Sequence, residues 1–167
     1  MKSDENMNNP ESHEIDVMCV RVSEPSWIPA LVRFSRRVLE VLEYSTWSLS
    51  VVLCDDEYIR QLNREYRGKD SATDVLSFPQ DDSNSEGGNP EADGGEPFYA
   101  GDIVISLNTL AENARYFSVN EEEELKRLLI HGILHLAGWD HSDNSPEQEM
   151  LQLQERILQG LSEEKIY

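Results

Sequence analysis

Three of the four histidines in the sequence lie within one stretch of eleven residues, at His131, His135 and His141. On a helix, His131 and His135 are four residues apart, which places both imidazoles on one face with their Cβ atoms about 5–6 Å apart. Gly138 allows the chain to leave that helix and turn, which would return His141 to the same place as a third nitrogen ligand. The alternative is three separate histidines with ordinary hydrogen bonds. The spacing H-x3-H-x5-H across a helix end favours a metal centre.

Three histidines and one open position make the ligand set of a catalytic zinc site, whereas structural zinc is usually enclosed by four protein ligands. Such a site lowers the pKa of a bound water or polarises a substrate oxygen. The spacing is similar to that of the metzincin zinc peptidases, H-E-x-x-H-x-x-G-x-x-H, but Gly132 stands where those enzymes carry their general base. The ligands are therefore present without the peptidase mechanism, and amide hydrolysis would need a base from elsewhere.

The elements that must position these residues follow from apolar periodicity and capping residues. Alternating apolar residues and β-branched runs predict four strands, and apolar residues at three- and four-residue spacing predict about five helices. The predicted strands are 15–22, 46–54, 75–78 and 102–105, and the predicted helices are 28–43, 55–66, 106–117, 121–137 and 146–159. Asn120 should cap the fourth helix, and 145–148 has the form of a capping box at the fifth. We expect a mixed α+β domain, with a sheet of about four strands and the metal site at the end of a central helix.

Length and composition set limits for the whole molecule. With 167 residues, 38% of them hydrophobic, the chain is typical of one folded globular domain. Residues 15–160 are expected to form that domain, with a polar extension at 1–14 and a tail at 161–167. Two cysteines, Cys19 and Cys54, are too few for a disulfide framework and are expected to be reduced and buried. A polar N-terminus and the lack of a long apolar run predict a cytoplasmic protein that is neither secreted nor embedded in a membrane.

The formal net charge of −19 is unevenly distributed along the chain. Residues 76–167 have a balance of −14, whereas residues 25–75 are nearly neutral. Half of the basic residues belong to that neutral segment, in one group at 33–37 and another at 60–69. Residues 81–97 are a low-complexity acidic stretch, which we expect to be a mobile loop. A chain with this negative charge is not expected to bind nucleic acid nonspecifically through a broad basic face. If the chain has a surface that binds an anion, we expect it within residues 25–75.

Three blocks of sequence form specific patterns. Residues 131–141 read HGILHLAGWDH, residues 62–79 read LNREYRGKDSATDVLSFP, and residues 101–106 read GDIVIS. The first block resembles H-G-x-x-H-L-x-G-[YW]-D-H of the YbeY family, and the second resembles that family's L-N-x-x-[YF]-R-x-x-D-x-P-T-D-V-L-S-F-P. The third is a weaker match to its G-D-[IL]-x-[IV]-[SC] strand. The YbeY family comprises bacterial metal-dependent endoribonucleases of ribosomal RNA maturation and ribosome quality control, and the resemblance spans about residues 15–160.

The resemblance implies roles for individual residues. It implies that His131, His135 and His141 hold one zinc ion and that Arg67 serves RNA binding and cleavage. A guanidinium is always charged and its planar fork matches two phosphate oxygens, so it suits the transition state of phosphodiester cleavage.

The basic residues of the second block have two interpretations each. Arg67 is alternatively the partner of an ion pair with Asp70 or Asp74. Arg64 and Lys69 are weaker candidates for RNA contacts, because surface cations usually bind nothing specific.

The neighbouring polar and aromatic residues are expected to have structural roles. Thr73 and Asp74 should fix the turn before the third strand through local hydrogen bonds, with a catalytic role as the alternative. Asp140 should orient a turn or a histidine. The aromatic side chains are expected in the core, with stacking on RNA bases as the alternative: Tyr66, Phe78 and Trp139.

Two features depart from the family pattern. Ala72 stands where the family usually has proline, so the turn that follows loses a preset φ. The acidic stretch 81–97 is longer and more negative than the family's usual connection. It would repel RNA if it folded over the site, so it is expected to point away or move aside.

The function implied by the resemblance is a zinc-dependent, single-strand-specific endoribonuclease that matures the 3′ end of 16S ribosomal RNA. The implied partners are ribosomal RNA and the small ribosomal subunit, with no role for DNA or a membrane. Two alternatives remain: a metal-stabilised ribosome assembly factor without catalysis, and a hydrolase of another substrate that uses the same three histidines. The negative charge adds an expectation of its own. Free RNA should be a poor, salt-sensitive substrate, and encounter should depend on docking to a basic ribosomal protein.

Overall fold

The computed structural model describes residues 13–80 and 97–167, so the expectations for the acidic stretch and for most of the N-terminal extension lie outside the described residues. Four strands and five helices are described, as the sequence predicts. In chain order they are β1 (Glu14–Val20), α1 (Ile28–Val41), β2 (Trp47–Cys54), α2 (Asp56–Arg67), β3 (Val75–Pro79), β4 (Phe98–Ser106), α3 (Leu107–Tyr116), α4 (Glu121–Leu136) and α5 (Glu149–Gly160).

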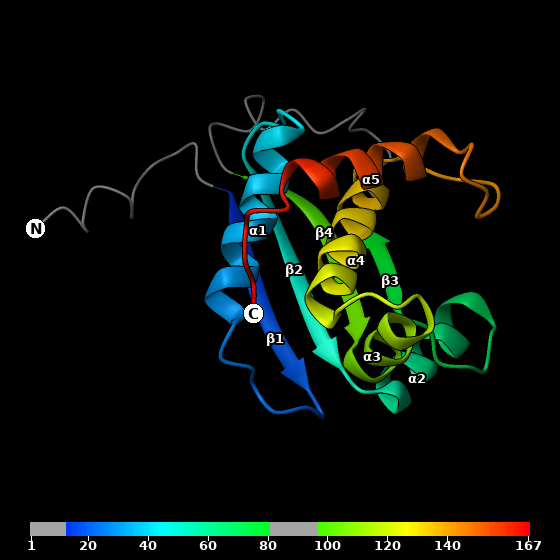
Figure 1. Cartoon of the computed structure of the whole chain (residues 1–167). Helices are drawn as coiled ribbons and strands as arrows, with labels where there is room; N and C mark the ends of the chain where they lie inside the picture. The colour runs from blue at the N-terminus through cyan, green and yellow to red at the C-terminus, as the bar shows by residue number, and fades with distance from the viewer. Residues whose placement is uncertain (1–12, 81–96) are drawn as a thin grey trace, which may run out of the picture.

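The four strands form one mixed sheet in the order β1-β2-β4-β3 (Figure 1). β1, β2 and β4 are parallel, with Val17 opposite Val51 and Val51 opposite Ile103, whereas β3 runs antiparallel to β4. The parallel pair β1 and β2 is joined through α1, as a parallel connection requires. The outcome is the mixed α+β domain that the sequence predicts.

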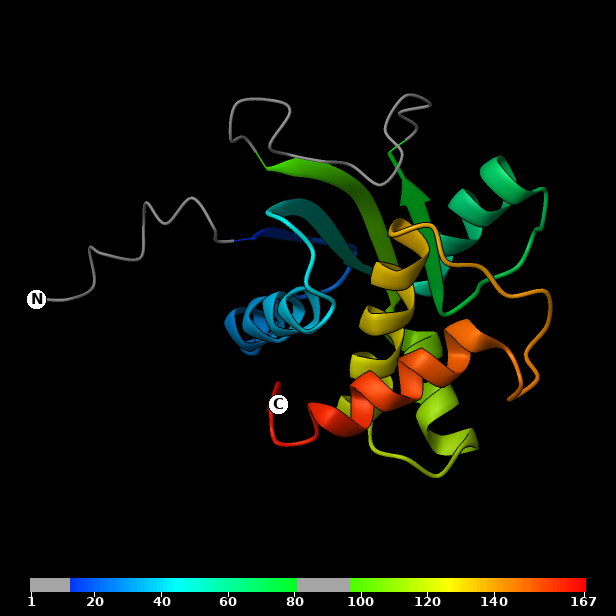
Figure 2. The ribbon, with the colours of Figure 1, turned by 90° about the horizontal axis from the view of Figure 1, so that it is seen from above.

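Helices cover the sheet unequally on its two faces, as Figure 2 shows from above. Val51, Leu53 and Ile103 belong to the larger core, which includes buried residues of α1 and α4. The alternate residues Val52 and Val104 point the other way and pack in a smaller cluster with Ile59 of α2. This alternation is the period-two pattern of a strand that is buried on both sides.

α4 is the central helix and is held close to the sheet. Its first turn is capped as predicted, because the Asn120 side chain accepts a hydrogen bond from the Glu123 N–H at 2.7 Å. Near its other end, a Cβ atom on Gly132 would lie only 2.8 Å from Cγ2 of Ile103 on β4. Gly132 therefore permits the helix to approach the sheet at the level of the histidines. Beyond Leu136 the chain turns at Gly138, which has a φ of +94°.

Some predicted boundaries are wrong. The capping box expected at 145–148 does not form, and α5 begins at Glu149 without a side-chain cap. The Gln148 side chain instead bonds to Ser142 and Asp143 in the preceding loop. β4 begins at Phe98, four residues before the predicted start, because it continues along β2, where Phe98 pairs with Trp47.

The two ends of the described chain pack onto the domain. His13 is 5% exposed, and Glu14 already belongs to β1. In the segment predicted as a C-terminal tail, Ile166 is buried and Tyr167 stacks on Trp27 with ring centres 5.1 Å apart. Of the helices in the described chain, none combines the length and apolar character needed to cross a membrane.

Candidate functional site

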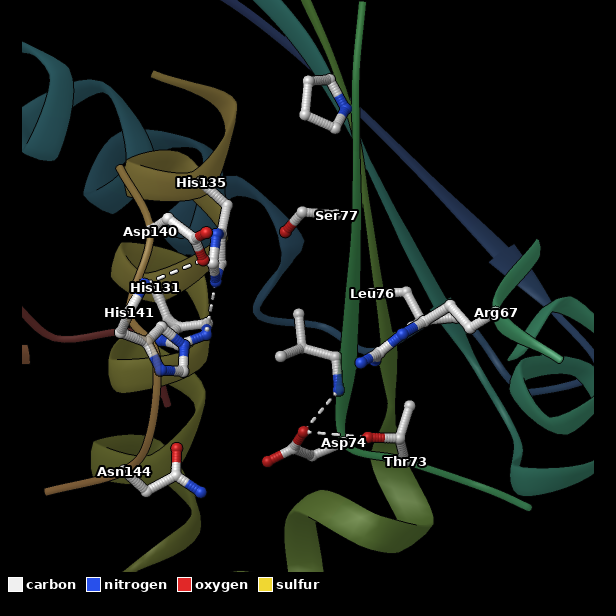
Figure 3. A pocket seen from close by; sticks show the side chains of 12 residues that line it. Arg67, Thr73, Asp74, Leu76, Ser77, His131, His135, Asp140, His141 and Asn144 are labelled. Carbon is white, nitrogen blue, oxygen red and sulfur yellow. Dashed lines mark hydrogen bonds between the residues drawn. The ribbon is translucent and has the colours of Figure 1, made fainter. Parts of the chain in front are cut away.

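A polar cavity of about 480 Å³ lies between the end of α4 and strand β3 (Figure 3). α4 and the loop after it supply one wall, and β3 with the turn before it supplies the other. Arg67 reaches the cavity from the last turn of α2, which ends at Gly68 in a left-handed conformation. The titratable residues that line the cavity are Arg67, Asp74, His131, His135, Asp140 and His141.

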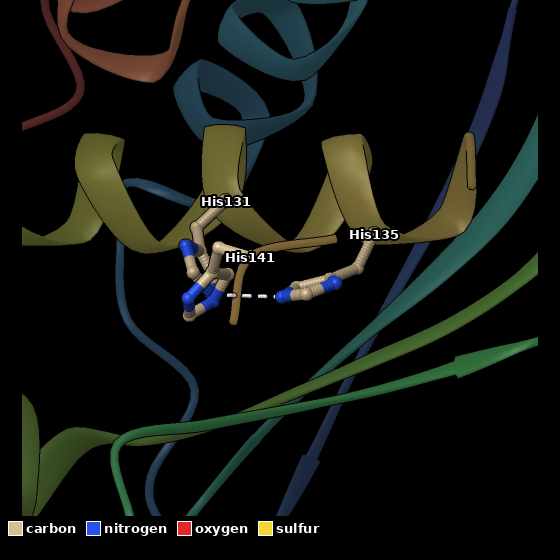
Figure 4. Close-up of side chains that lie close together, drawn as sticks. All are labelled: His131, His135 and His141. Atoms are coloured by element: carbon tan, nitrogen blue, oxygen red, sulfur yellow. Dashed lines mark hydrogen bonds between the residues drawn. The ribbon is translucent and has the colours of Figure 1, made fainter. Parts of the chain in front are cut away.

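The three histidines form one compact group, as the sequence predicts (Figure 4). One ring nitrogen from each lies within 4.8 Å of the others. The Nε2 atoms of His131 and His135 are 3.1 Å apart. His141 returns from the loop after Gly138, with its ring centre 5.2 Å from that of His131. The structure thus brings together the residues that the spacing assigned to one ion.

Hydrogen bonds fix which nitrogen carries the proton in two of the rings. His135 Nδ1 lies 3.1 Å from the carbonyl oxygen of Trp139, and His141 Nδ1 lies 2.9 Å from that of Asp143. A carbonyl oxygen only accepts, so both Nδ1 atoms must carry a proton. In the neutral rings the Nε2 atoms then hold lone pairs, which is the state of a histidine that binds a metal through Nε2.

The electrostatics of the group suit a divalent cation. Burial lowers the pKa of His131, and burial together with the neighbouring His131 and His141 lowers the pKa of His135. The lowered pKa values favour neutral imidazoles, the form in which histidine binds a metal ion. Imidazole nitrogens suit zinc, copper, iron and nickel. The donor set therefore fits a divalent transition-metal ion.

The alternative interpretation of Arg67, an ion pair with Asp70 or Asp74, is wrong. Asp70 instead binds Arg60, with Nε 2.9 Å from Oδ1. Asp74 accepts hydrogen bonds from the Val75 N–H at 2.7 Å and from other polar groups. Within the described residues, the Arg67 guanidinium has no hydrogen bond or ion pair. It points into a cavity that it shares with the histidines, as Figure 3 shows.

The remaining candidates among the basic residues are placed differently. Arg64 and Lys69 are exposed and lie near the end of α2, but neither lines the cavity. Their role in RNA binding stays a prediction.

The local turns form as expected around the two aspartates of the cavity. The Asp74 carboxylate holds the start of β3 through the Val75 N–H, and its second oxygen accepts from Asn113 Nδ2 at 3.0 Å. Asp140 accepts a hydrogen bond from the backbone N–H of His141 at 2.8 Å and so orients the turn that returns this ligand. Both carboxylates therefore shape the cavity walls.

The aromatic residues divide between surface and interior. Tyr66 is 66% exposed, contrary to the expectation of a core position, and its ring meets Phe78 edge to face. These two rings line a separate hollow between α2 and the sheet, away from the histidines. Trp139 is half-buried against the main core. None of the three lines the histidine cavity.

Two contacts to the site were missed by sequence reasoning. Gln154 of α5 lies with its Oε1 2.7 Å from His131 Nδ1, and Asn113 of α3 holds Asp74. Both come from helices that are distant in sequence. The only signal for Gln154 is a polar residue at a position of α5 that the apolar period assigns to the interior.

The fold and site define an α+β protein with a cavity in which three histidines could hold a metal ion. Comparisons with known proteins agree on its family. The model of the family described as endoribonuclease YbeY matches residues 8–162. The chain is 50% identical over 149 residues to the endoribonuclease YbeY of Treponema pallidum strain Nichols, covering 89% of each protein. It is 53% identical over 134 residues to that of Treponema denticola, covering 80% of this chain and 83% of the relative.

A solved structure has the same fold. The solution structure of TM1509 from Thermotoga maritima matches with a TM-score of 0.59 and 28% identity, covering 89% of this chain and 90% of that one. Taken with the family match, these relatives show that the chain belongs to the YbeY endoribonuclease family.

Proposed function

We propose that this protein is a zinc-dependent endoribonuclease that cleaves single-stranded RNA, and that it acts in 16S ribosomal RNA 3′ end maturation and ribosome quality control. The observation that carries the proposal is the shared cavity, in which an arginine without an ion pair among the described residues faces a group of histidines that fits a metal ion. The names of the relatives support the same activity, since they are endoribonucleases. A cavity with this chemistry suits a phosphodiester, which is anionic and must accept further charge as it is cleaved.

The roles of the chain's own residues follow from their positions. Arg67 would donate its N–H groups to the non-bridging oxygens of the scissile phosphate and stabilise the charge of the pentacoordinate transition state. His131, His135 and His141 would hold the zinc ion through Nε2. When bound, that ion supplies Lewis-acid chemistry, which polarises a phosphoryl oxygen or lowers the pKa of a water. Asp74 and Asp140 shape the walls through their hydrogen bonds to the backbone.

The test is cleavage of a single-stranded RNA by zinc-loaded protein freed of contaminating nucleases. Arg67→Met should keep its fold and its zinc but lose about 10²–10³ in kcat, the cost of removing one donor to a transition-state oxyanion. Arg33→Met is the matched control, because Arg33 is exposed on α1 and does not line the cavity. His135→Ala should lose zinc and cleavage together. A wild-type protein that holds zinc and cuts no RNA would refute the proposal.

The net charge of −19 supports a further part of the proposal, the need for a docking partner. We propose that a basic ribosomal protein brings the enzyme to its substrate, because long-range repulsion opposes encounter with free RNA. Cleavage of naked RNA should therefore be slow and sensitive to salt, and faster on assembled ribosomal particles. Equal rates on naked RNA and on particles would contradict this part alone.

A further inference from the structure

One of the three histidines is held in a different way from the other two. His135 and His141 present Nδ1 to backbone carbonyls, whose orientation is set by the fold. His131 instead presents Nδ1 to a side-chain amide, with Gln154 Oε1 at 2.7 Å. An amide group is nearly symmetric, so its NH2 end would fit the same place after a half turn. The bond to Gln154 therefore fixes the His131 tautomer only if something fixes the amide.

The NH2 group of the Gln154 amide has a partner that fixes the orientation of the amide. Gln154 Nε2 lies 3.0 Å from Oε2 of Glu155. An ionised carboxylate only accepts, so the NH2 group must face Glu155 and the carbonyl oxygen must face His131. A half turn of the amide would bring two oxygens together at that distance. Gln154 is 6% exposed, so solvent offers the amide little alternative to these two partners.

The carboxylate of Glu155 is in turn held by Arg127 on the neighbouring helix α4. Arg127 donates from Nε to Oε2 at 3.0 Å and from Nη2 to Oε1 at 3.2 Å, a two-pronged ion pair. Although burial opposes ionisation, the hydrogen bonds from Arg127 and Gln154 keep the pKa of Glu155 below its ordinary value. The carboxylate is thus ionised, and both of its oxygens are fixed in place between α4 and α5.

We propose that Gln154 and Glu155, with Arg127, are positioning residues that keep the proton of His131 on Nδ1, so that its Nε2 lone pair is directed to the metal. This role rests on the metal centre of the proposed function and concerns residues that do not touch the metal themselves. With it, all three histidines have a protonated Nδ1 and a free Nε2. The facing Nε2 atoms of His131 and His135, 3.1 Å apart, then both offer lone pairs, which a cation between them would satisfy.

The structure offers a matched pair of variants for the test. Glu155 and Glu123 both bind Arg127 and have similar side-chain exposure, at 47% and 42%. Only Glu155 also receives the Gln154 amide. Glu155→Ala and Glu123→Ala therefore each remove one negative charge and one carboxylate that binds Arg127, but only Glu155→Ala frees the amide. Gln154→Leu removes the acceptor itself.

The first measurement is the tautomer of His131 in metal-free protein at a pH where the ring is neutral, read from the ¹⁵N chemical shifts of the imidazole. The wild type and Glu123→Ala should show a proton on Nδ1. Glu155→Ala and Gln154→Leu should show a mixture of the two tautomers. A wild-type ring that carries its proton on Nε2 would overturn the proposal.

The second measurement is zinc affinity by competition with a chromogenic chelator. Gln154→Leu should bind zinc about 10–100-fold more weakly, the usual effect of losing a residue that orients a ligand. Glu155→Ala should lose more affinity than Glu123→Ala. Equal affinities for wild type and Gln154→Leu would overturn the proposal even if RNA cleavage is established. Conversely, a wild type with Nδ1–H on His131 but no affinity for zinc would support this positioning role and refute the metal centre.

Discussion

The close approach of α4 to the sheet makes Gly132 a sensitive position, and Gly132→Ala tests it. A Cβ atom there would lie 2.8 Å from Cγ2 of Ile103 and 3.0 Å from its Cδ1 and Cγ1. The best separation of two carbon atoms is about 3.5–4.0 Å, so Ile103 would have to retreat by roughly half an ångström or more. Ile103 is fully buried, so its retreat must displace other core side chains.

The size of the effect follows from two opposing contributions. Overpacking a core by one methyl group costs about 1–3 kcal/mol. Replacing glycine by alanine inside a helix gains up to about 1 kcal/mol. Gly160 is the matched control, because it lies at the end of α5 with no atom within 4 Å of its added Cβ. Gly160→Ala should therefore be neutral or stabilising, and the difference between the two variants should be about 1–3 kcal/mol.

The assay is urea unfolding of both variants in a chelator, so that bound metal does not contribute to the free energy of unfolding. Gly132→Ala should have the lower transition midpoint with an unchanged slope. Equal midpoints for Gly132→Ala and Gly160→Ala would refute the packing argument. The same argument explains why this position does not carry the glutamate of zinc peptidases, since a side chain there would point at β4 and not at the cavity.

Three further predictions concern other parts of the fold. Burial lowers the pKa of His13 from its usual 6.5, and the neutral ring accepts a hydrogen bond from the Trp47 N–H through Nδ1. The stability that His13 contributes should therefore be fully present above about pH 6.5 and should be lost as the pH falls toward the lower pKa of the folded state. His13→Gln should flatten this loss in urea unfolding at a series of pH values. Asn113→Ala removes a hydrogen bond to the Asp74 carboxylate and should cost about 1–3 kcal/mol of unfolding free energy. Burial raises the pKa of Cys54 to about 12, so a thiol reagent should modify this residue only after unfolding.

Sequence patterns were sufficient to place the strands and helices and to group the three histidines. The strands and helices follow from apolar periods, whereas the order in which the strands pair could not be read from the sequence. The three histidines could be assigned to one site because they are close in sequence and share a helix end. Local geometry of this kind is dictated by a few neighbouring residues.

Contacts between distant segments could not be read in this way. Nothing in the spacing of Gln154 points to His131, because their contact depends on how α5 lies across α4. The choice of partner for Asp70 was also out of reach, since Arg60 and Arg67 are both plausible from their positions in the chain. The structure assigns Asp70 to Arg60 and leaves Arg67 in the cavity. Such choices depend on side-chain packing and not on local pattern.

The central claim is that the three-histidine centre carries out RNA cleavage, and a metal titration tests it most directly. Metal-free protein would be titrated with zinc while the rate of cleavage of a single-stranded RNA is measured. We predict no cleavage without metal, a linear rise with added zinc and saturation at one equivalent per chain, with no response in His135→Ala. Cleavage that is present before zinc is added, or that His135→Ala retains, would contradict the account.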